Sequence, residues 1–187
     1  MRNVVYNHVT MQNQYLTSNN LNRVLSKRAA KTINAVRNGC WENAYHALME
    51  LPELAHGQYV EGWFVRIDLP IPIEHAWIEL EGKLIDPTPI SWHARYAYLP
   101  ALRFTRDELV EALMEKTALP IAWRYGWGGM HHPAYAQAYQ DAWWFAVPVT
   151  AEQRTKLSKG TKPVYLPRRE TSPQLLHQVL AQSDTAI

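Results

Sequence analysis

The sequence predicts an α+β fold in which helices surround one antiparallel sheet. Apolar residues recur every three to four positions in the first and last parts of the chain, which is typical of amphipathic helices. Between them, over residues 59–86, apolar and polar residues alternate as in strands. A tight-turn signal at Glu81-Gly82 joins two of the alternating segments, so we expect a hairpin and an antiparallel sheet.

The first third is predicted to hold an extended arm and two helices. Residues 1–17 lack a clear period and form the arm. A basic amphipathic helix is expected from an N-cap at Ser18 or Asn19 to about Asn38-Gly39. A second helix is expected to begin at Cys40 and to end at Pro52, because proline cannot continue a helix.

The strands and later helices follow from local patterns. Strands are predicted over 59–67, 75–80 and 83–86, with a proline-bounded connection between the first two. A capping box at 105–108 predicts a helix to about Lys116, and Pro133 opens another through Trp144. A short helix from Thr150 and a terminal one over 172–182 complete the chain. We therefore expect an arm (1–17), one domain (18–158), and a linker with a C-terminal helix (159–187).

Composition limits the functional classes. The chain of 187 residues has one cysteine, so no disulfide can form within it, and no apolar run is long enough to span a membrane. A reducing, cytoplasmic setting is expected. The net charge is only +2, but the first 41 residues contain six basic residues and no acid. This segment suits an acidic partner or the acidic remainder of the chain itself; nucleic acid is not expected, since no nucleic-acid motif accompanies the charge.

The single cysteine lies in a setting that suits a nucleophile. A thiol reacts as the thiolate, which is stabilised at a helix N-terminus and beside an imidazolium. Cys40 follows Gly39 at a predicted helix start. A base must then come from elsewhere in the fold and be oriented by a third group. With the turn at Glu81-Gly82, residue 77 or 78 faces 85 or 86, so the side chains of His75 and Asp86 can meet diagonally.

These residues together resemble the transglutaminase-like branch of the papain-like cysteine hydrolase superfamily. The order is Cys40 in GCW at a helix start, His75 in HAW on a strand, and Asp86 in DPT at the end of the next strand. The resemblance covers about residues 34–90. It implies a papain-like or transglutaminase-like core, with the nucleophile helix packed on an antiparallel sheet and extra helices around it.

The resemblance also implies a chemistry. Cys40 would attack an amide or ester carbonyl of a peptide or protein substrate, His75 would act as general base and then acid, and Asp86 would orient its ring. The Cys40 N–H and a side-chain donor, Asn34 or Asn38, would hold the oxyanion. Substrate contacts are expected from three tryptophans, Trp41, Trp77 and Trp127. No cofactor or metal is implied.

Alternative interpretations remain open. A lone cysteine on an amphipathic helix is often a small core residue. The glycine-rich and aromatic segment 123–132 suits either a lid over the thiol or part of the core. Adjacent histidines at 131 and 132 are not expected to hold a metal, because no cysteine or carboxylate lies at ligand spacing. The rival to an enzyme is a binding module that uses the basic helix and the aromatic loop to hold an acidic protein or nucleic acid.

Overall fold

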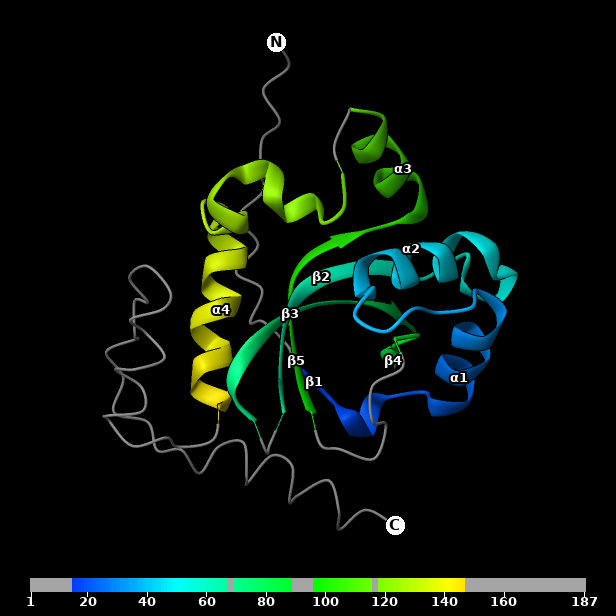
Figure 1. The fold of residues 1–187 in the computed structure, drawn as a ribbon, viewed down its shortest axis with the longest axis horizontal. Coiled ribbons are helices and arrows are strands. Elements are labelled where there is room, and N and C mark those ends of the chain that lie inside the picture. Colours follow the sequence, from blue (N-terminus) through cyan, green and yellow to red (C-terminus); the bar gives the residue numbers. More distant parts are fainter. Residues whose placement is uncertain (1–14, 67–68, 89–95, 116–117, 147–187) are drawn as a thin grey trace.

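A computed structural model describes residues 15–66, 69–88, 96–115 and 118–146 (Figure 1). The strands are β1 (Leu16–Thr17), β2 (Gln58–Arg66), β3 (Leu69–Leu80), β4 (Lys83–Ile85) and β5 (Tyr96–Phe104). The α-helices are α1 (Arg23–Thr32), α2 (Cys40–Glu50), α3 (Arg106–Met114) and α4 (Pro133–Phe145). Short 3₁₀ helices span Ser18–Asn20, Pro52–Leu54, Ile121–Tyr125 and Trp127–Gly129.

The strands form one antiparallel sheet that curls almost into a barrel. Its order is β1-β5-β2-β3-β4, and every pairing is antiparallel. Beyond β1 the chain turns through a 3₁₀ helix to Leu21, which forms a parallel bridge with Leu84 of β4. The Asn22 N–H donates to the Leu84 carbonyl oxygen at 2.8 Å. The two edges of the sheet are thereby joined at this point.

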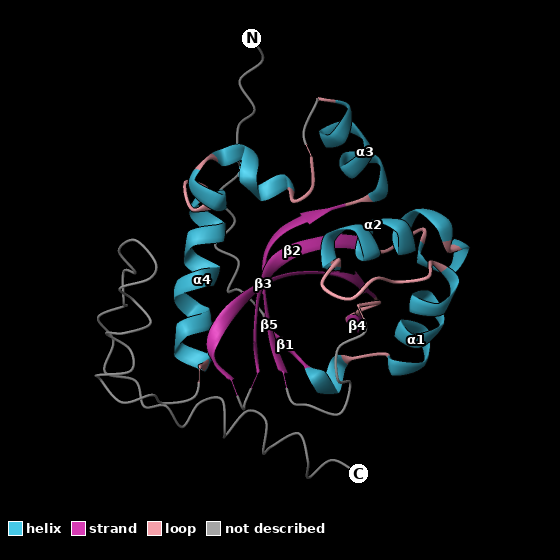
Figure 2. Ribbon diagram, viewed as in Figure 1, coloured by secondary structure: helices cyan, strands magenta, loops and turns pink. Residues whose placement is uncertain are grey.

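Apolar side chains fill the inside of the curl and cover its outside. One buried cluster contains Val60, Phe64, Trp77, Leu84 and Tyr98, which alternate with residues that face outward. On the outer face, α1, α2 and α3 contribute to a second cluster with Ile78 and Ile85. A third lies between α4 and the strands β2 and β5. Figure 2 shows α4 beside one end of the sheet and α1 and α2 beside the other.

The predicted α+β layout and most of its elements are confirmed. The helix at Cys40 ends before Pro52, the hairpin turns at Glu81-Gly82, and Ile78 pairs with Ile85. Thr105 caps α3 through a capping box, and Pro133 opens α4. Most of the expected arm (1–14), the helices from Thr150 and over 172–182, and the linker lie outside the described residues. Among the described residues, no helix is both long and apolar enough to cross a bilayer.

The predicted basic helix is wrong in its length. It begins only at Arg23, where Asn22 accepts from the Leu25 N–H, and it ends at Thr32. Asn34 then adopts a left-handed conformation with φ of 52°, which asparagine tolerates better than most residues and which often ends a helix. Residues 33–39 are therefore a loop leading to Cys40.

The sequence analysis missed β5 and the first half of β3, because prolines interrupt both segments. In β3, Pro70 and Pro72 lie where β4 no longer pairs, since the β3–β4 ladder spans only Ile78–Leu80. In β5, Pro100 pairs with Gly62 at a β-bulge. A Cβ on Gly62 would lie 2.2 Å from the Leu99 carbonyl oxygen, so only glycine permits this approach of the two strands.

Candidate active site

Cys40 is the first residue of α2, and its side chain is 7% exposed. The helix has no side-chain cap: its N-cap is Gly39, and the first helical bond at this end runs from the Asn43 N–H to the Gly39 oxygen. The N–H groups of Cys40, Trp41 and Glu42 have no acceptor among the described residues. Unpaired N–H groups and the helix dipole together favour negative charge at this position.

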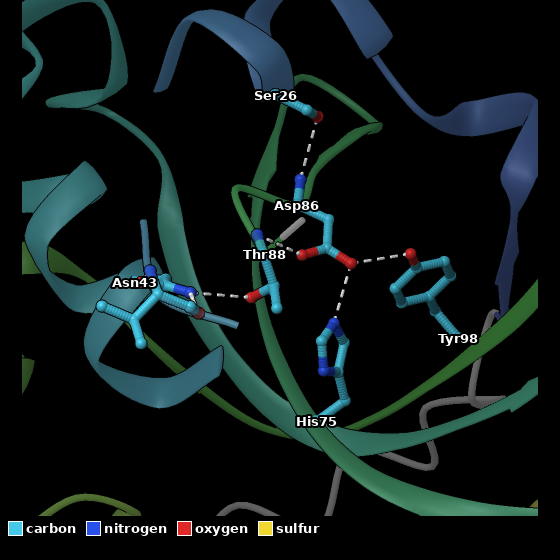
Figure 3. A network of polar contacts seen from close by, with 7 residues as sticks. Ser26, Asn43, His75, Asp86, Thr88 and Tyr98 are labelled. Atoms are coloured by element: carbon cyan, nitrogen blue, oxygen red, sulfur yellow. Dashed lines mark hydrogen bonds and ion pairs between the residues drawn. The ribbon is translucent and has the colours of Figure 1, made fainter. Parts of the chain in front are cut away.

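A buried amide fixes the loop that presents Cys40 (Figure 3). Asn43 Oδ1 accepts from the Val36 N–H at 2.9 Å, and Nδ2 donates to the Val36 oxygen at 2.7 Å. Nδ2 also donates to Thr88 Oγ1 at 3.4 Å. The Asn43 side chain, which comes from α2, thus binds both the loop before the helix and the segment after β4.

His75 and Asp86 form the pair that the hairpin register predicted. The His75 Nε2 lies 2.7 Å from Asp86 Oδ2, and the two residues are 2% and 1% exposed. Cys40 lies close enough to the His75 ring to raise the pKa of the imidazole. Since Nε2 faces the carboxylate, Nδ1 is the ring nitrogen left for the thiol. Cys40, His75 and Asp86 are therefore brought together in one continuous line.

Further donors hold the Asp86 carboxylate in place (Figure 3). The Tyr98 hydroxyl donates to Oδ2 at 2.9 Å, and the Thr88 N–H donates to Oδ1 at 3.0 Å. The Asp86 N–H donates to Ser26 Oγ of α1 at 3.0 Å. Because both oxygens accept hydrogen bonds, the orientation of the carboxylate is fixed.

The surroundings of His75 favour its charged form. Burial lowers the pKa of the imidazole, but the negative charge and hydrogen bond of Asp86 and the proximity of Cys40 raise it more, from 6.5 to about 10. Aromatic rings of Phe64, Trp77 and Tyr98 surround the imidazole, with centroids 4.6, 6.2 and 6.1 Å away. The site therefore favours the imidazolium, and the bond to Asp86 holds the ring in one orientation.

The residues expected to hold the oxyanion and those expected to contact the substrate differ in their exposure and contacts. Asn34 and Asn38 are exposed on the loop before Cys40, and their side chains make no hydrogen bond within the described part of the chain. Trp77 is fully buried inside the sheet, where it supports His75 and presents no surface to a substrate. Trp127 is half-exposed beside His131. Trp41 is partly exposed and contacts Trp123, with ring centroids 5.5 Å apart.

Three supporting residues were missed by the sequence reasoning. Tyr98 lies on the unpredicted β5, Ser26 on α1, and Asn43 on α2. Nothing local in the sequence marks Tyr98 or Ser26, since their roles depend on pairings across 12 and 60 residues. Asn43 carried a signal, because a buried amide inside an apolar helix face needs partners.

Metal binding has no support in the described residues, where no three His, Cys, Asp or Glu side chains gather as a metal site. Comparison with protein-family models, curated proteins and solved structures found no match. The geometry of the site is thus the basis for any functional conclusion.

Proposed function

We propose that this protein is a cysteine-dependent hydrolase or acyltransferase that acts on an amide through Cys40, His75 and Asp86. The observation that carries the proposal is the order of neighbouring groups: the Cys40 thiol lies near the His75 imidazole, which bonds to the Asp86 carboxylate. Hydrogen bonds on both of its oxygens hold that carboxylate in one orientation. Such an arrangement belongs to nucleophilic catalysis rather than to a core cysteine, which needs no oriented base. A free thiol at the site also favours a reducing compartment such as the cytoplasm.

The reaction would proceed in two steps, acylation of Cys40 and then attack on the resulting thioester. The Cys40 thiolate attacks the carbonyl carbon, a C–S bond forms, and the carbonyl electron pair moves to oxygen beside the free N–H groups of α2. The pair returns as the C–N bond breaks, and His75 gives its proton to the departing amine. Water or a second amine then loses a proton to His75 and attacks the thioester, and the C–S bond breaks to release the product and restore the thiolate beside the protonated His75.

The test is the pH dependence of Cys40 alkylation by iodoacetamide, followed by mass spectrometry. Cys40 is the only cysteine, so all thiol reactivity reports on this site. We expect reaction at about pH 6 in the wild type, and a rate lower by about tenfold or more in His75→Ala, because the thiolate loses its cation.

His46→Ala is the matched control, since His46 lies exposed on the same helix, where it pairs with Glu50 and its ring contacts Tyr45. It should react like the wild type. Equal rates in His75→Ala and the wild type, with both proteins folded, would contradict the proposal. Turnover on amide substrates, once found, should disappear in Cys40→Ser.

A binding module is the second candidate, because α1 exposes a basic face. Arg23, Lys27 and Lys31 are exposed, whereas Arg28 pairs with Glu53 of the same chain at 2.8 Å. This candidate predicts an acidic partner whose affinity falls with salt and survives Cys40→Ser. The two candidates are therefore separated by one substitution.

A further inference from the structure

A series of neighbouring side chains leads from Cys40 to the residue before His75. Trp41 follows Cys40 in the chain and contacts Trp123 at 5.5 Å between ring centroids. The Trp123 side chain lies close enough to Glu74 to lower the pKa of its carboxyl, and Glu74 precedes His75 on β3. The His75 ring in turn lies near Cys40. We call Trp41, Glu74, Trp123 and Tyr135 the flanking cluster.

Trp123 is held in this position by a buried carboxylate. Glu61 of β2 accepts from the N–H groups of Ile121 and Ala122, both at 2.7 Å, and from the Tyr59 hydroxyl at 2.9 Å. The 3₁₀ helix that carries Trp123 is thereby attached to the sheet at its N-terminal end. Even so, the Trp123 side chain is 50% exposed, so one side of its ring is open to a ligand.

Glu74 is a partly buried anion with no cationic partner among the described residues. Burial raises the pKa of its carboxyl, and the nearby donor groups of Trp123 and Tyr135 lower it by less. A desolvated carboxylate of this kind gains more from a cation than a fully solvated one does. The indole faces next to it also attract positive charge through cation–π contacts.

The Tyr135 hydroxyl is a second, independent sign of a ligand. The side chain is fully buried, and its oxygen has no partner at hydrogen-bond geometry. Burial raises its pKa, and so do the nearby charges of Glu74, Glu61 and Cys40. The hydroxyl therefore lies near Glu74 and the thiol, although its alignment with Glu74 is too poor for a good hydrogen bond. A buried polar group without a partner is costly and rare in a protein interior.

We propose that the flanking cluster binds a positively charged side chain of the substrate, a lysine or arginine next to the attacked carbonyl. Glu74 pairs with the cation, and the rings of Trp41 and Trp123 contact its aliphatic stem. Glu74 is in this way a specificity-determining residue. The inference rests on the proposed function, since it names the substrate class of the same thiol.

The test uses reagents that differ in charge and all modify Cys40. Aminoethyl, methyl and sulfonatoethyl methanethiosulfonate carry positive, zero and negative charge and form a mixed disulfide with a thiolate. Second-order rate constants are measured for the wild type, Glu74→Gln and Glu81→Gln, and each is divided by that for free cysteine. Glu81 is the matched control, because it lies seven residues away along the hairpin, about 20 Å at strand spacing.

We expect Glu74→Gln to lower the aminoethyl-to-methyl ratio by about threefold or more and to raise the sulfonatoethyl-to-methyl ratio. Glu81→Gln should change neither. Unchanged ratios in Glu74→Gln, or equal changes in both variants, would overturn the inference while leaving the alkylation result and the proposed function intact. A thiol that resists all three reagents in the folded protein would overturn both.

A second variant covers the case in which Glu74→Gln does not fold, as judged by near-ultraviolet circular dichroism. Trp123→Leu changes a half-exposed side chain. It should reduce the relative rate with trimethylammonioethyl methanethiosulfonate, which binds rings but donates no hydrogen bond. No reduction in this variant would count against the aromatic part of the site.

Discussion

The Asp86 carboxylate receives hydrogen bonds on both oxygens, and this determines what a substitution there should do. Oδ2 accepts from His75 and Tyr98, and Oδ1 accepts from the Thr88 N–H. An amide in its place keeps only one accepting atom and turns an NH₂ group toward a donor. The His75–Asp86 pair is therefore sensitive even to the replacement of one carboxylate oxygen by an NH₂ group.

We predict that Asp86→Asn lowers the Cys40 alkylation rate at about pH 6 to near that of His75→Ala, because the imidazolium loses its counter-charge. It should also lower the free energy of unfolding by about 1–3 kcal/mol, since a buried donor is left unpaired. Urea denaturation and alkylation measure the two effects. Asp107→Asn, exposed on α3, is the control and should change neither. Wild-type alkylation by Asp86→Asn would show that the carboxylate is not needed to charge the histidine.

The charge on His75 also predicts how stability depends on pH. Its pKa is raised on folding, from 6.5 to about 10, so the folded state binds the proton more tightly. The resulting stabilisation is complete below pH 6.5 and is lost as the pH rises through about 10. We expect the free energy of unfolding to fall over this range in the wild type and to fall much less in His75→Gln. Parallel pH profiles of the two proteins would rule out the raised pKa.

At the scale of elements, the N-terminus of α2 depends on one side chain for its position. Asn43 binds the backbone of Val36 through both its oxygen and its nitrogen and reaches Thr88 beyond β4. The helix, the loop before it and the segment that carries Asp86 are thereby joined. The distance between thiol and imidazole follows from this junction.

We predict that Asn43→Ala lowers the free energy of unfolding by about 1–3 kcal/mol, because buried polar groups of the loop lose their partner. It should also slow Cys40 alkylation at about pH 6, although Asn43 is not a catalytic residue. Gln137→Ala on α4 is the control, since the exposed Gln137 donates to Asp141 Oδ1 at 2.8 Å on its own helix. A variant that loses stability but keeps full thiol reactivity would show that the loop does not position Cys40.

At the scale of the whole molecule, the site depends on closure of the sheet. His75 and Asp86 come from the hairpin, Tyr98 from β5, and Ser26 from a helix beyond the Leu21–Leu84 bridge. Tyr98 and Ser26 reach Asp86 only when the sheet curls. The bulge between β2 and β5 sets part of that curl.

We therefore predict that Gly62→Ala destabilises the protein more than the addition of one methyl group usually does. Its Cβ would meet the Leu99 oxygen at 2.2 Å, so the β2 and β5 backbones must move apart. We expect a loss of stability of about 1–3 kcal/mol or more, measured by urea denaturation. Ala101→Gly in the same bulge adds no atom between the two strands and is the control. A Gly62→Ala variant of wild-type stability would contradict the close approach of these strands.

The sequence predicted the parts of this fold that depend on neighbours in the chain. The cap at Thr105, the turn at Glu81-Gly82 and the start of α2 follow from local residue preferences, and the turn alone was enough to align His75 with Asp86. Prolines concealed β5 and half of β3, because their tolerance there depends on which neighbouring strands pair. The curl of the sheet, and with it Tyr98 and Ser26, follows from contacts between distant segments that no local pattern encodes.

Closure of the sheet has a consequence for the order of events during synthesis. Cys40 and His75 leave the ribosome well before Tyr98, and the strand that places Tyr98 against Asp86 comes later still than the hairpin. A nascent chain that ends before β5 therefore lacks part of the network that fixes the carboxylate and, through it, the imidazolium. Under the proposed function, such a chain would not attack an amide before β5 has paired with β2, so the order of the strands would delay the chemistry until the protein has folded.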